Sequence, residues 1–150
     1  MRKLYFAAAL YTLLGLAAGL YYRDLTKAHD FTGRTELAVT HTHLLALGTL
    51  FLLIVIALEK QFALSETKTF PWFFWTYNAG VLWTTVFMTI HGTLTVLGQE
   101  VSAVISGLAG LGHILLTAGF LLFFICLYRP VTSQSDRAHS TPVHQSHQAI

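Results

Sequence analysis

Long stretches without a charged residue alternate with short polar segments along this chain of 150 residues. Each stretch meets or nearly meets the roughly 20 residues that a membrane-spanning helix needs. Because hydrocarbon offers no partner to backbone N–H and C=O groups, such stretches are expected to be helical. A transmembrane β-barrel would instead show short segments of alternating apolar and polar residues, and the sequence has none. The pattern predicts spanning helices over Leu4–Tyr22, Leu37–Leu58, Phe70–Leu97 and Val101–Tyr128.

The first apolar stretch also has a feature of a signal peptide, since Arg2 and Lys3 precede it. However, the stretch is long, and the residues Leu20-Tyr21-Tyr22-Arg23 form a poor cleavage context. Paired tyrosines at the end of an apolar stretch are typical of anchors at the membrane interface. We therefore favour a helix that is retained in the protein.

The composition supports a membrane protein. The chain is 54% hydrophobic and 11% charged, whereas a soluble domain carries about 25% charged residues. We therefore predict an all-α fold, an integral membrane four-helix bundle that occupies residues 1–129 as one domain. Residues 130–150 are rich in Ser, Gln and His, which predicts a disordered C-terminal tail.

The basic residues predict the orientation of the bundle. Four spans place both termini on one side, and that side carries six of the nine Lys and Arg residues. These six are Arg2, Lys3, Lys60, Lys68, Arg129 and Arg137. Because cytoplasmic segments carry the excess of Lys and Arg, both termini are expected on the cytoplasmic side.

Several classes of site can be excluded. The net charge is only +2, and no basic stripe interleaved with aromatic residues is present, so nucleic acid is a poor partner. The single cysteine, Cys126, permits neither an internal disulfide nor a cysteine cluster for zinc or iron–sulfur. None of the four apolar stretches contains Asp or Glu, which excludes a di-iron carboxylate site.

Four histidines lie inside the apolar stretches: His41, His43, His91 and His113. A histidine in a bilayer is costly, so it marks a functional site by default. Counting along the helices places the first three about 6 to 9 Å from the predicted outer end. His113 lies about 18 Å from that end, and it joins the same layer if the membrane begins later on the last stretch. A single histidine in such a place often serves as an interfacial hydrogen-bonding group, but four on three helices favour a heme or metal site.

The spacing of these histidines limits how they share a site. Neutral imidazole suits iron and copper. His41 and His43 point about 200° apart on one helix and cannot serve the same site. Gly48 shares a face with His41 and leaves room for a flat macrocycle. We predict that His41 and His113 are the axial ligands of a heme b, with Gly48 beside it. His43 and His91 are then expected to hydrogen-bond nearby or to hold a second metal such as copper.

The octet His-Thr-His-Leu-Leu-Ala-Leu-Gly, from His41 to Gly48, resembles the second-helix signature of heme–copper oxygen reductases and nitric oxide reductases. The resemblance implies that His41 is the ligand of a low-spin heme and that Gly48 closes the motif. The sequence lacks the adjacent histidine pair that binds copper in that family, which argues against dioxygen reduction.

Most of residues 1–128 resembles an uncharacterised family of small four-helix bacterial membrane proteins of unknown function. That resemblance implies a multi-pass protein of the bacterial inner (cytoplasmic) membrane and places His41 and His113 in motif segments. The matching stretches are Lys3-Leu4-Tyr5, Tyr22-Arg23-Asp24, Asp30-Phe31-Thr32-Gly33, the octet from His41 to Gly48, and the segment from Ile105 to His113.

The function expected from these features is heme b binding, or heme or metal binding, for electron transfer or for binding a small gas such as NO or O2. Any enzymatic activity would then be that of an oxidoreductase. A small transporter or proton relay, and a structural or assembly subunit without a cofactor, remain alternatives. Besides the lipid bilayer, the expected partner is a second copy or a larger membrane complex, since four helices cover a heme thinly. Gly15 and Gly19 form a small-residue face on the first helix that suits association.

Overall fold

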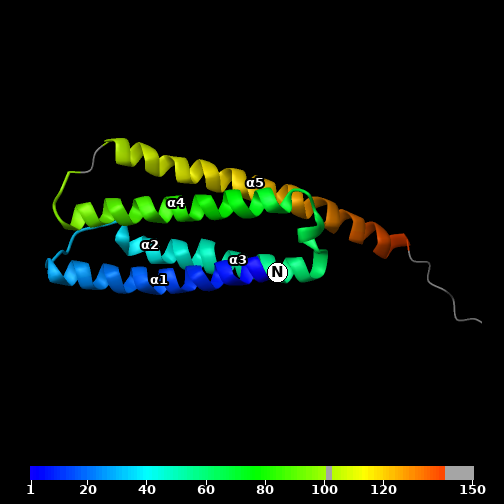
Figure 1. Cartoon of the computed structure of the whole chain (residues 1–150), viewed down its shortest axis with the longest axis horizontal. Helices are drawn as coiled ribbons and strands as arrows, with labels where there is room; N and C mark the ends of the chain where they lie inside the picture. Colours follow the sequence, from blue (N-terminus) through cyan, green and yellow to red (C-terminus); the bar gives the residue numbers. More distant parts are fainter. Residues whose placement is uncertain (101–102, 141–150) are drawn as a thin grey trace, which may run out of the picture.

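A computed structural model describes residues 1–100 and 103–140 of the chain. Over these residues the structure consists of helices and contains no strand, which confirms the all-α prediction (Figure 1). The elements are α1 (Arg2–Ala28), α2 (Leu37–His43), the π-helix η1 (Leu44–Leu50), α3 (Phe51–Phe62), the 3-10 helix η2 (Leu64–Glu66), α4 (Phe70–Val96) and α5 (Ala103–Ser140).

Four helices are long and apolar enough to cross a membrane. The elements α2, η1 and α3 follow one another without a break and act as a single span, Leu37–Phe62. The other three spans are Arg2–Ala28, Phe70–Val96 and Gly107–Thr132. Helix length and composition thus agree with the four spans that the sequence predicted, and they mark a multi-pass membrane protein.

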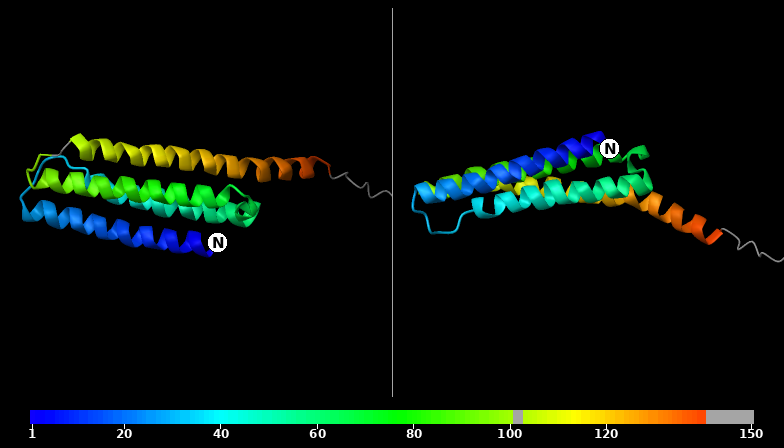
Figure 2. Two further views of the ribbon diagram at one scale, coloured as in Figure 1. Left: turned by 45° about the horizontal axis from the view of Figure 1, so that its top comes forward. Right: turned by 90° about the horizontal axis from the view of Figure 1, so that it is seen from below.

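The bundle is open rather than closed into a ring. α1 packs along α2, η1 and α3, while α4 packs along α5. The two pairs meet where α2 and η1 lie against α4 and where α3 lies against α5. Across the described part of the chain α1 and α5 share no contact, and they lie at opposite edges of the bundle (Figures 1 and 2).

The two ends of the bundle differ. The turns that follow α1 and α4 lie at one end, which we call the loop end (Figure 1). The N-terminus and the η2 turn lie at the other end, which we call the N-terminal end, and α5 extends beyond it (Figure 1).

Glycines let the helices approach one another closely. A Cβ atom added at Gly80 of α4 would lie 2.8 Å from the backbone nitrogen of Leu116 in α5. A Cβ atom at Gly119 would lie 2.9 Å from the Cα atom of Tyr77. Because lipid gives little hydrophobic driving force between helices, such close backbone packing contributes much of the stability of the α4–α5 pair.

The small-residue face on α1 packs within the chain. A Cβ atom at Gly15 would lie 2.8 Å from the side chain of Leu45 in η1, and one at Gly19 would lie 3.8 Å from His41 of α2. The face that the sequence suggested for association therefore joins α1 to its neighbour in the same molecule.

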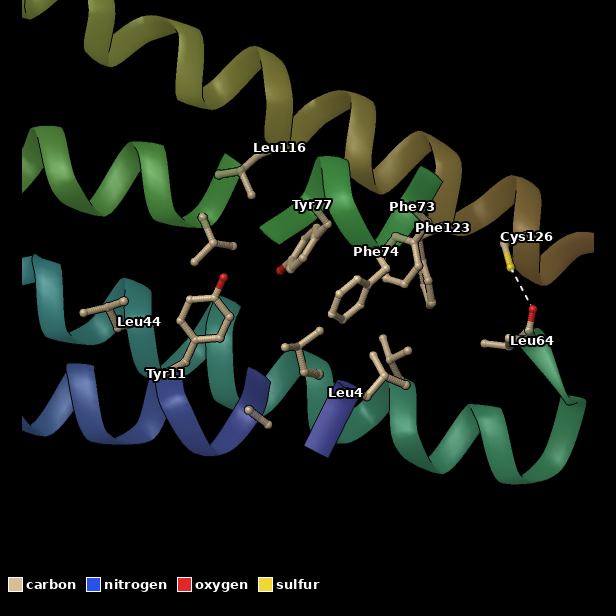
Figure 3. Close-up of a cluster of buried hydrophobic side chains, with 14 residues drawn as sticks. Leu4, Tyr11, Leu44, Leu64, Phe73, Phe74, Tyr77, Leu116, Phe123 and Cys126 are labelled. Carbon is tan, nitrogen blue, oxygen red and sulfur yellow. Dashed lines mark hydrogen bonds between the residues drawn. The ribbon is translucent and has the colours of Figure 1, made fainter. Parts of the chain in front are cut away.

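Aromatic side chains fill the core between α3, α4 and α5, as Figure 3 shows for Tyr77 and Phe123. The ring of Phe51 lies 4.6 Å from that of Tyr77, 5.1 Å from that of Phe120 and 5.2 Å from that of Phe123, measured between centroids. The Tyr77 hydroxyl donates to the carbonyl of Leu47 in η1 at 3.0 Å. The π-helical turn is therefore tied to α4, and π-helical turns are frequent at functional sites.

A buried carboxylate holds the turn at the N-terminal end. Glu59, only 7% exposed, accepts hydrogen bonds from the backbone nitrogen of Ser65 at 2.7 Å and from the Ser65 hydroxyl. The chain turns at Ala63, whose φ is 48°. The thiol of Cys126 in α5 lies 2.8 Å from the Thr67 hydroxyl, so α5 is also joined to this turn.

We expect the Glu59→Ala variant to be less stable by about 1–3 kcal/mol, because the Ser65 N–H then loses its acceptor. Thermal unfolding in detergent measures this loss. Glu66→Ala, which removes an exposed carboxylate from the same turn, is the matched control and should unfold like the unsubstituted protein. Equal destabilisation by both substitutions would contradict a specific role for Glu59.

Several helix ends differ from the predicted boundaries. α1 continues past Tyr22 to Ala28, and α5 continues through Pro130 to Ser140, although we expected a disordered tail from residue 130. Charged and polar residues mark where an apolar stretch ends, but a helix can extend beyond the hydrocarbon because water satisfies its exposed groups. Residues 101–102, at the start of the fourth predicted span, and 141–150 lie outside the described residues.

Candidate functional site

The four histidines of the sequence analysis lie in the loop-end half of the bundle. His41 and His43 belong to α2, His91 lies near the end of α4, and His113 lies in the first third of α5. Which of these histidines could bind one cofactor depends on the side of the helix that each occupies and on the atoms around its ring.

His41 faces α1. Its Cβ atom lies 3.8 Å from a Cβ atom added at Gly19, and its Nδ1 atom is buried with no hydrogen-bond partner among the described residues. Gly48 also faces α1, where the ring of Tyr11 fills the space that a Cβ atom at Gly48 would need. The room that we expected beside Gly48 is thus occupied by a side chain of α1.

His43 is oriented by the backbone of its own helix. Its Nδ1 atom lies 2.9 Å from the carbonyl oxygen of Val39. Since a carbonyl only accepts, Nδ1 carries the proton, and the neutral ring keeps its lone pair on Nε2. The Nε2 atom of His43 is therefore the nitrogen that is free to bind a metal.

His91 is paired with a carboxylate from the start of α2. Its Nδ1 atom lies 3.3 Å from the Oε1 atom of Glu36. The two groups are close but do not form a hydrogen bond. Next to it the Thr35 hydroxyl donates to the carbonyl of Gly92 at 2.8 Å and ties the start of α2 to α4. A cavity of about 360 Å³ at this place is lined by Arg34, Thr35, Glu36, Val39, His91 and Thr95.

His113 is exposed on α5. It lies about 100° around the helix from Gly112, which packs against Thr84 of α4. It shares a face with Phe120, seven residues on, whose ring packs on Phe51 of α3. His113 therefore lies on the flank of α5 that is turned toward the span made by α2, η1 and α3.

His43 and His113 lie on helices that both pack against α4, the helix that carries His91, although α2 and α5 share no contact among the described residues. His43 is seven residues after Glu36, so it shares the side of α2 that meets His91. His91 is in turn seven residues after Thr84, the residue of α4 that packs against α5. His41 lies on the opposite side of α2, so the structure does not bring His41 and His113 together.

Two close glycine contacts show where these histidines lie along the bundle axis. Leu37 packs against Gly92, and Gly112 packs against Thr84, so α2 and α5 can both be placed against α4. With a rise of 1.5 Å per residue, His43 and His113 lie within about 5 Å of each other along the bundle axis, and His91 lies about 7 Å nearer the loop end than His43.

The side chains do not form a compact site for a single ion. Among the residues that the structure describes, no group of three or more His, Cys, Asp or Glu side chains is close enough to hold a metal ion. Two imidazoles that approach a heme from opposite sides need no such cluster, because the porphyrin supplies the remaining ligands. Histidine ligands of metals commonly donate a hydrogen bond from the second ring nitrogen to a carbonyl or a carboxylate, and His43 makes such a bond to Val39.

Sequence reasoning missed two partners in this region. Thr35 and Glu36 had no place in the predicted site, whereas in the structure Glu36 contacts His91 and Thr35 donates a hydrogen bond to Gly92. The only sequence signal for the contact between Glu36 and His91 was an acidic residue next to the second span. The sequence did not show which histidine would lie beside that residue.

The fold and the histidines define a multi-pass four-helix membrane protein with imidazole side chains inside its spans. The chain belongs to the family described as "Protein of unknown function (DUF2871)", whose model matches residues 1–130. No curated protein and no solved structure matches the chain. The predicted membership of an uncharacterised family is thereby confirmed, while the local resemblance of the octet from His41 to Gly48 to heme–copper reductases stays a prediction.

Proposed function

We propose that the protein binds a heme b, or another metal centre, between α2, α4 and α5 in the loop-end half of the bundle. The observation that carries the proposal is that Nδ1 of His43 donates to the carbonyl of Val39, which leaves Nε2 of that ring free to bind a metal. Ligands held in this way keep one tautomer and one ring orientation. His113 lies at a similar height on α5, on the flank of that helix that Phe120 shares.

We favour His43 and His113 as the axial pair, because they lie at similar heights on helices that flank α4. The pair His41 and His113, with Gly48 beside the heme, is the alternative that rests on the sequence motif. If His43 is the axial ligand, His91 orients a ligand or holds a proton next to Glu36. If His41 is the axial ligand, His43 and His91 are left to bind a second metal such as copper. A heme with two histidine ligands suits electron transfer, and one with a vacant position suits a small gas.

The absorption spectrum of the purified protein tests this proposal. A strong Soret band supports a heme, while a colourless protein that contains a stoichiometric metal supports a metal centre. A colourless protein without metal would favour the alternatives, namely a small transporter or proton relay and a cofactor-free assembly subunit. The contact of His91 with Glu36 is the observation that favours a proton relay.

We further propose that both termini lie in the cytoplasm of a bacterial inner membrane, with the histidines near the outer face. A reporter that is active only in the cytoplasm should be active when fused after Arg129 and inactive when fused at Gln99. Activity at Gln99 would contradict the orientation and move the site to the cytoplasmic half.

We also expect self-association or assembly into a larger membrane complex. α5 has an exposed face at which a Cβ atom added to Gly107 or Gly110 would meet nothing within 4 Å, and His113 is exposed beside it. Small residues on an open face permit close contact with another helix. Native mass spectrometry from a mild detergent should show a dimer or larger species, and a purely monomeric protein would contradict this expectation.

A further inference from the structure

An apolar groove runs along the side of the bundle between α1 and α4. Its part near the N-terminal end has a volume of about 430 Å³, with Leu10 and Trp75 among its walls. Its part near the loop end has a volume of about 390 Å³, with Leu14 and Val86 among its walls. Leu82 of α4 lines both parts, so they adjoin and extend over much of the length of the bundle.

The polar groups in and beside this groove already have partners. The Tyr11 hydroxyl donates to the Oδ1 atom of Asn78 at 2.9 Å, and the Asn78 amide donates to the carbonyl of Phe74 at 2.7 Å. Toward the loop end, the Tyr21 and Thr93 hydroxyls lie 3.0 Å apart. An occupant therefore needs an apolar body and no hydrogen-bonding groups along most of its length.

The mouth of the groove at the N-terminal end is basic. Arg2 and Lys3 line it, and within the described part of the chain neither residue forms an ion pair. Trp75 lies beside them with 65% of its surface exposed. Tryptophan is enriched where hydrocarbon meets the polar headgroups, so this mouth has the character of a membrane interface.

We propose that this groove binds an anionic phospholipid, with one acyl chain between α1 and α4 and the phosphate at Arg2 and Lys3. Guanidinium and ammonium groups are the usual protein partners of phosphate. A second copy of the chain fits less well. A parallel, two-fold symmetric dimer through this groove would bring two basic mouths together, and like charges repel.

Quenching of Trp75 fluorescence by brominated lipids tests the proposal. The full chain with Trp72→Phe and Trp83→Phe, which keeps Trp75 as its only tryptophan, is reconstituted into phosphatidylcholine vesicles. Brominated phosphatidylglycerol or brominated phosphatidylcholine is added in the same small mole fraction. Each basic residue near the surface favours an anionic lipid about fivefold, and the effects of Arg2 and Lys3 multiply. Brominated phosphatidylglycerol should therefore bind roughly 25-fold more strongly beside Trp75.

A matched pair of variants locates the effect. Arg2→Gln combined with Lys3→Gln should reduce the preference to about twofold or less, because the charge at the mouth is lost. Lys60→Gln combined with Lys68→Gln removes the same charge from the end of α3 and from the turn before α4, outside the groove, and should leave the preference unchanged.

Equal quenching by the two brominated lipids would overturn the proposal, and so would a preference that survives the loss of Arg2 and Lys3. If Trp75 is protected from both lipids, a second copy or another protein fills the groove, and the lipid proposal is wrong. The folded state of each variant is checked by its thermal midpoint, so that loss of preference is not confused with unfolding.

Discussion

The His113→Ala variant should fail to bind the heme that we propose for this protein. His113 belongs to both candidate axial pairs, with His43 on geometric grounds and with His41 on the basis of the sequence motif. Loss of an orienting partner of a metal ligand already weakens binding about 10–100-fold, so loss of a ligand itself should weaken it at least as much. The Soret absorbance per chain, measured after purification under identical heme supply, should fall to less than about a tenth of that of the unsubstituted protein.

The two pairs differ in their second ligand. If His43 is axial, His43→Ala should remove the Soret band and His41→Ala should leave it nearly unchanged. If His41 is axial instead, as the sequence motif implies, His41→Ala should remove the Soret band and His43→Ala should leave it nearly unchanged. His29→Ala removes an exposed histidine from the turn after α1 and serves as the control. A spectrum that survives His113→Ala but is lost in His91→Ala would contradict both pairs and assign the ligand to α4.

Gly112→Val should disrupt the α4–α5 pair. A Cβ atom at Gly112 would lie 3.0 Å from the backbone nitrogen and 3.1 Å from the Cα atom of Thr84, and backbone cannot move aside as a flexible side chain does. We expect a loss of stability of about 3 kcal/mol, at the upper end of the usual cost of overpacking. For a chain of this size the thermal midpoint in detergent should fall by about 10 °C.

Gly110→Val provides the matched control on the same helix, because a Cβ atom added at Gly110 would meet nothing within 4 Å. In a detergent that keeps the protein monomeric, where no second helix covers this face, it should unfold close to the unsubstituted protein, within about 0.5 kcal/mol. Because Gly112 adjoins His113, the Gly112 variant should also bind less heme. Equal stability of the two valine variants would contradict the packing of α5 on α4 described above.

The sequence predicted the four spans because hydrocarbon excludes charge and forces backbone hydrogen bonds into each helix. It also showed that His41 and His43 point apart, since the helical period fixes the angle between residues of one helix. The sequence did not show which neighbouring helix each face of the second span packs against. That depends on contacts between distant residues, such as Gly19 with His41 and Glu36 with His91.

Helix ends and close packing were less predictable. Nothing in the local sequence distinguished Gly112, which packs against Thr84, from Gly110, which faces open space. The π-helix η1 was also not anticipated. Its residues are ordinary apolar ones, and the Tyr77 hydroxyl that bonds to its Leu47 carbonyl comes from another helix. Such features arise from the assembled bundle, so a pattern read along one helix does not reveal them.

The most direct test of the proposed heme site is the ratio of heme to protein chain in purified, full-length protein, measured as the pyridine hemochrome with heme supplied during expression. We expect a heme b signal that approaches one heme per chain, or per oligomer if copies share the site, and that disappears in His113→Ala. A folded, membrane-inserted protein that contains neither heme nor a stoichiometric metal under these conditions would contradict the proposal.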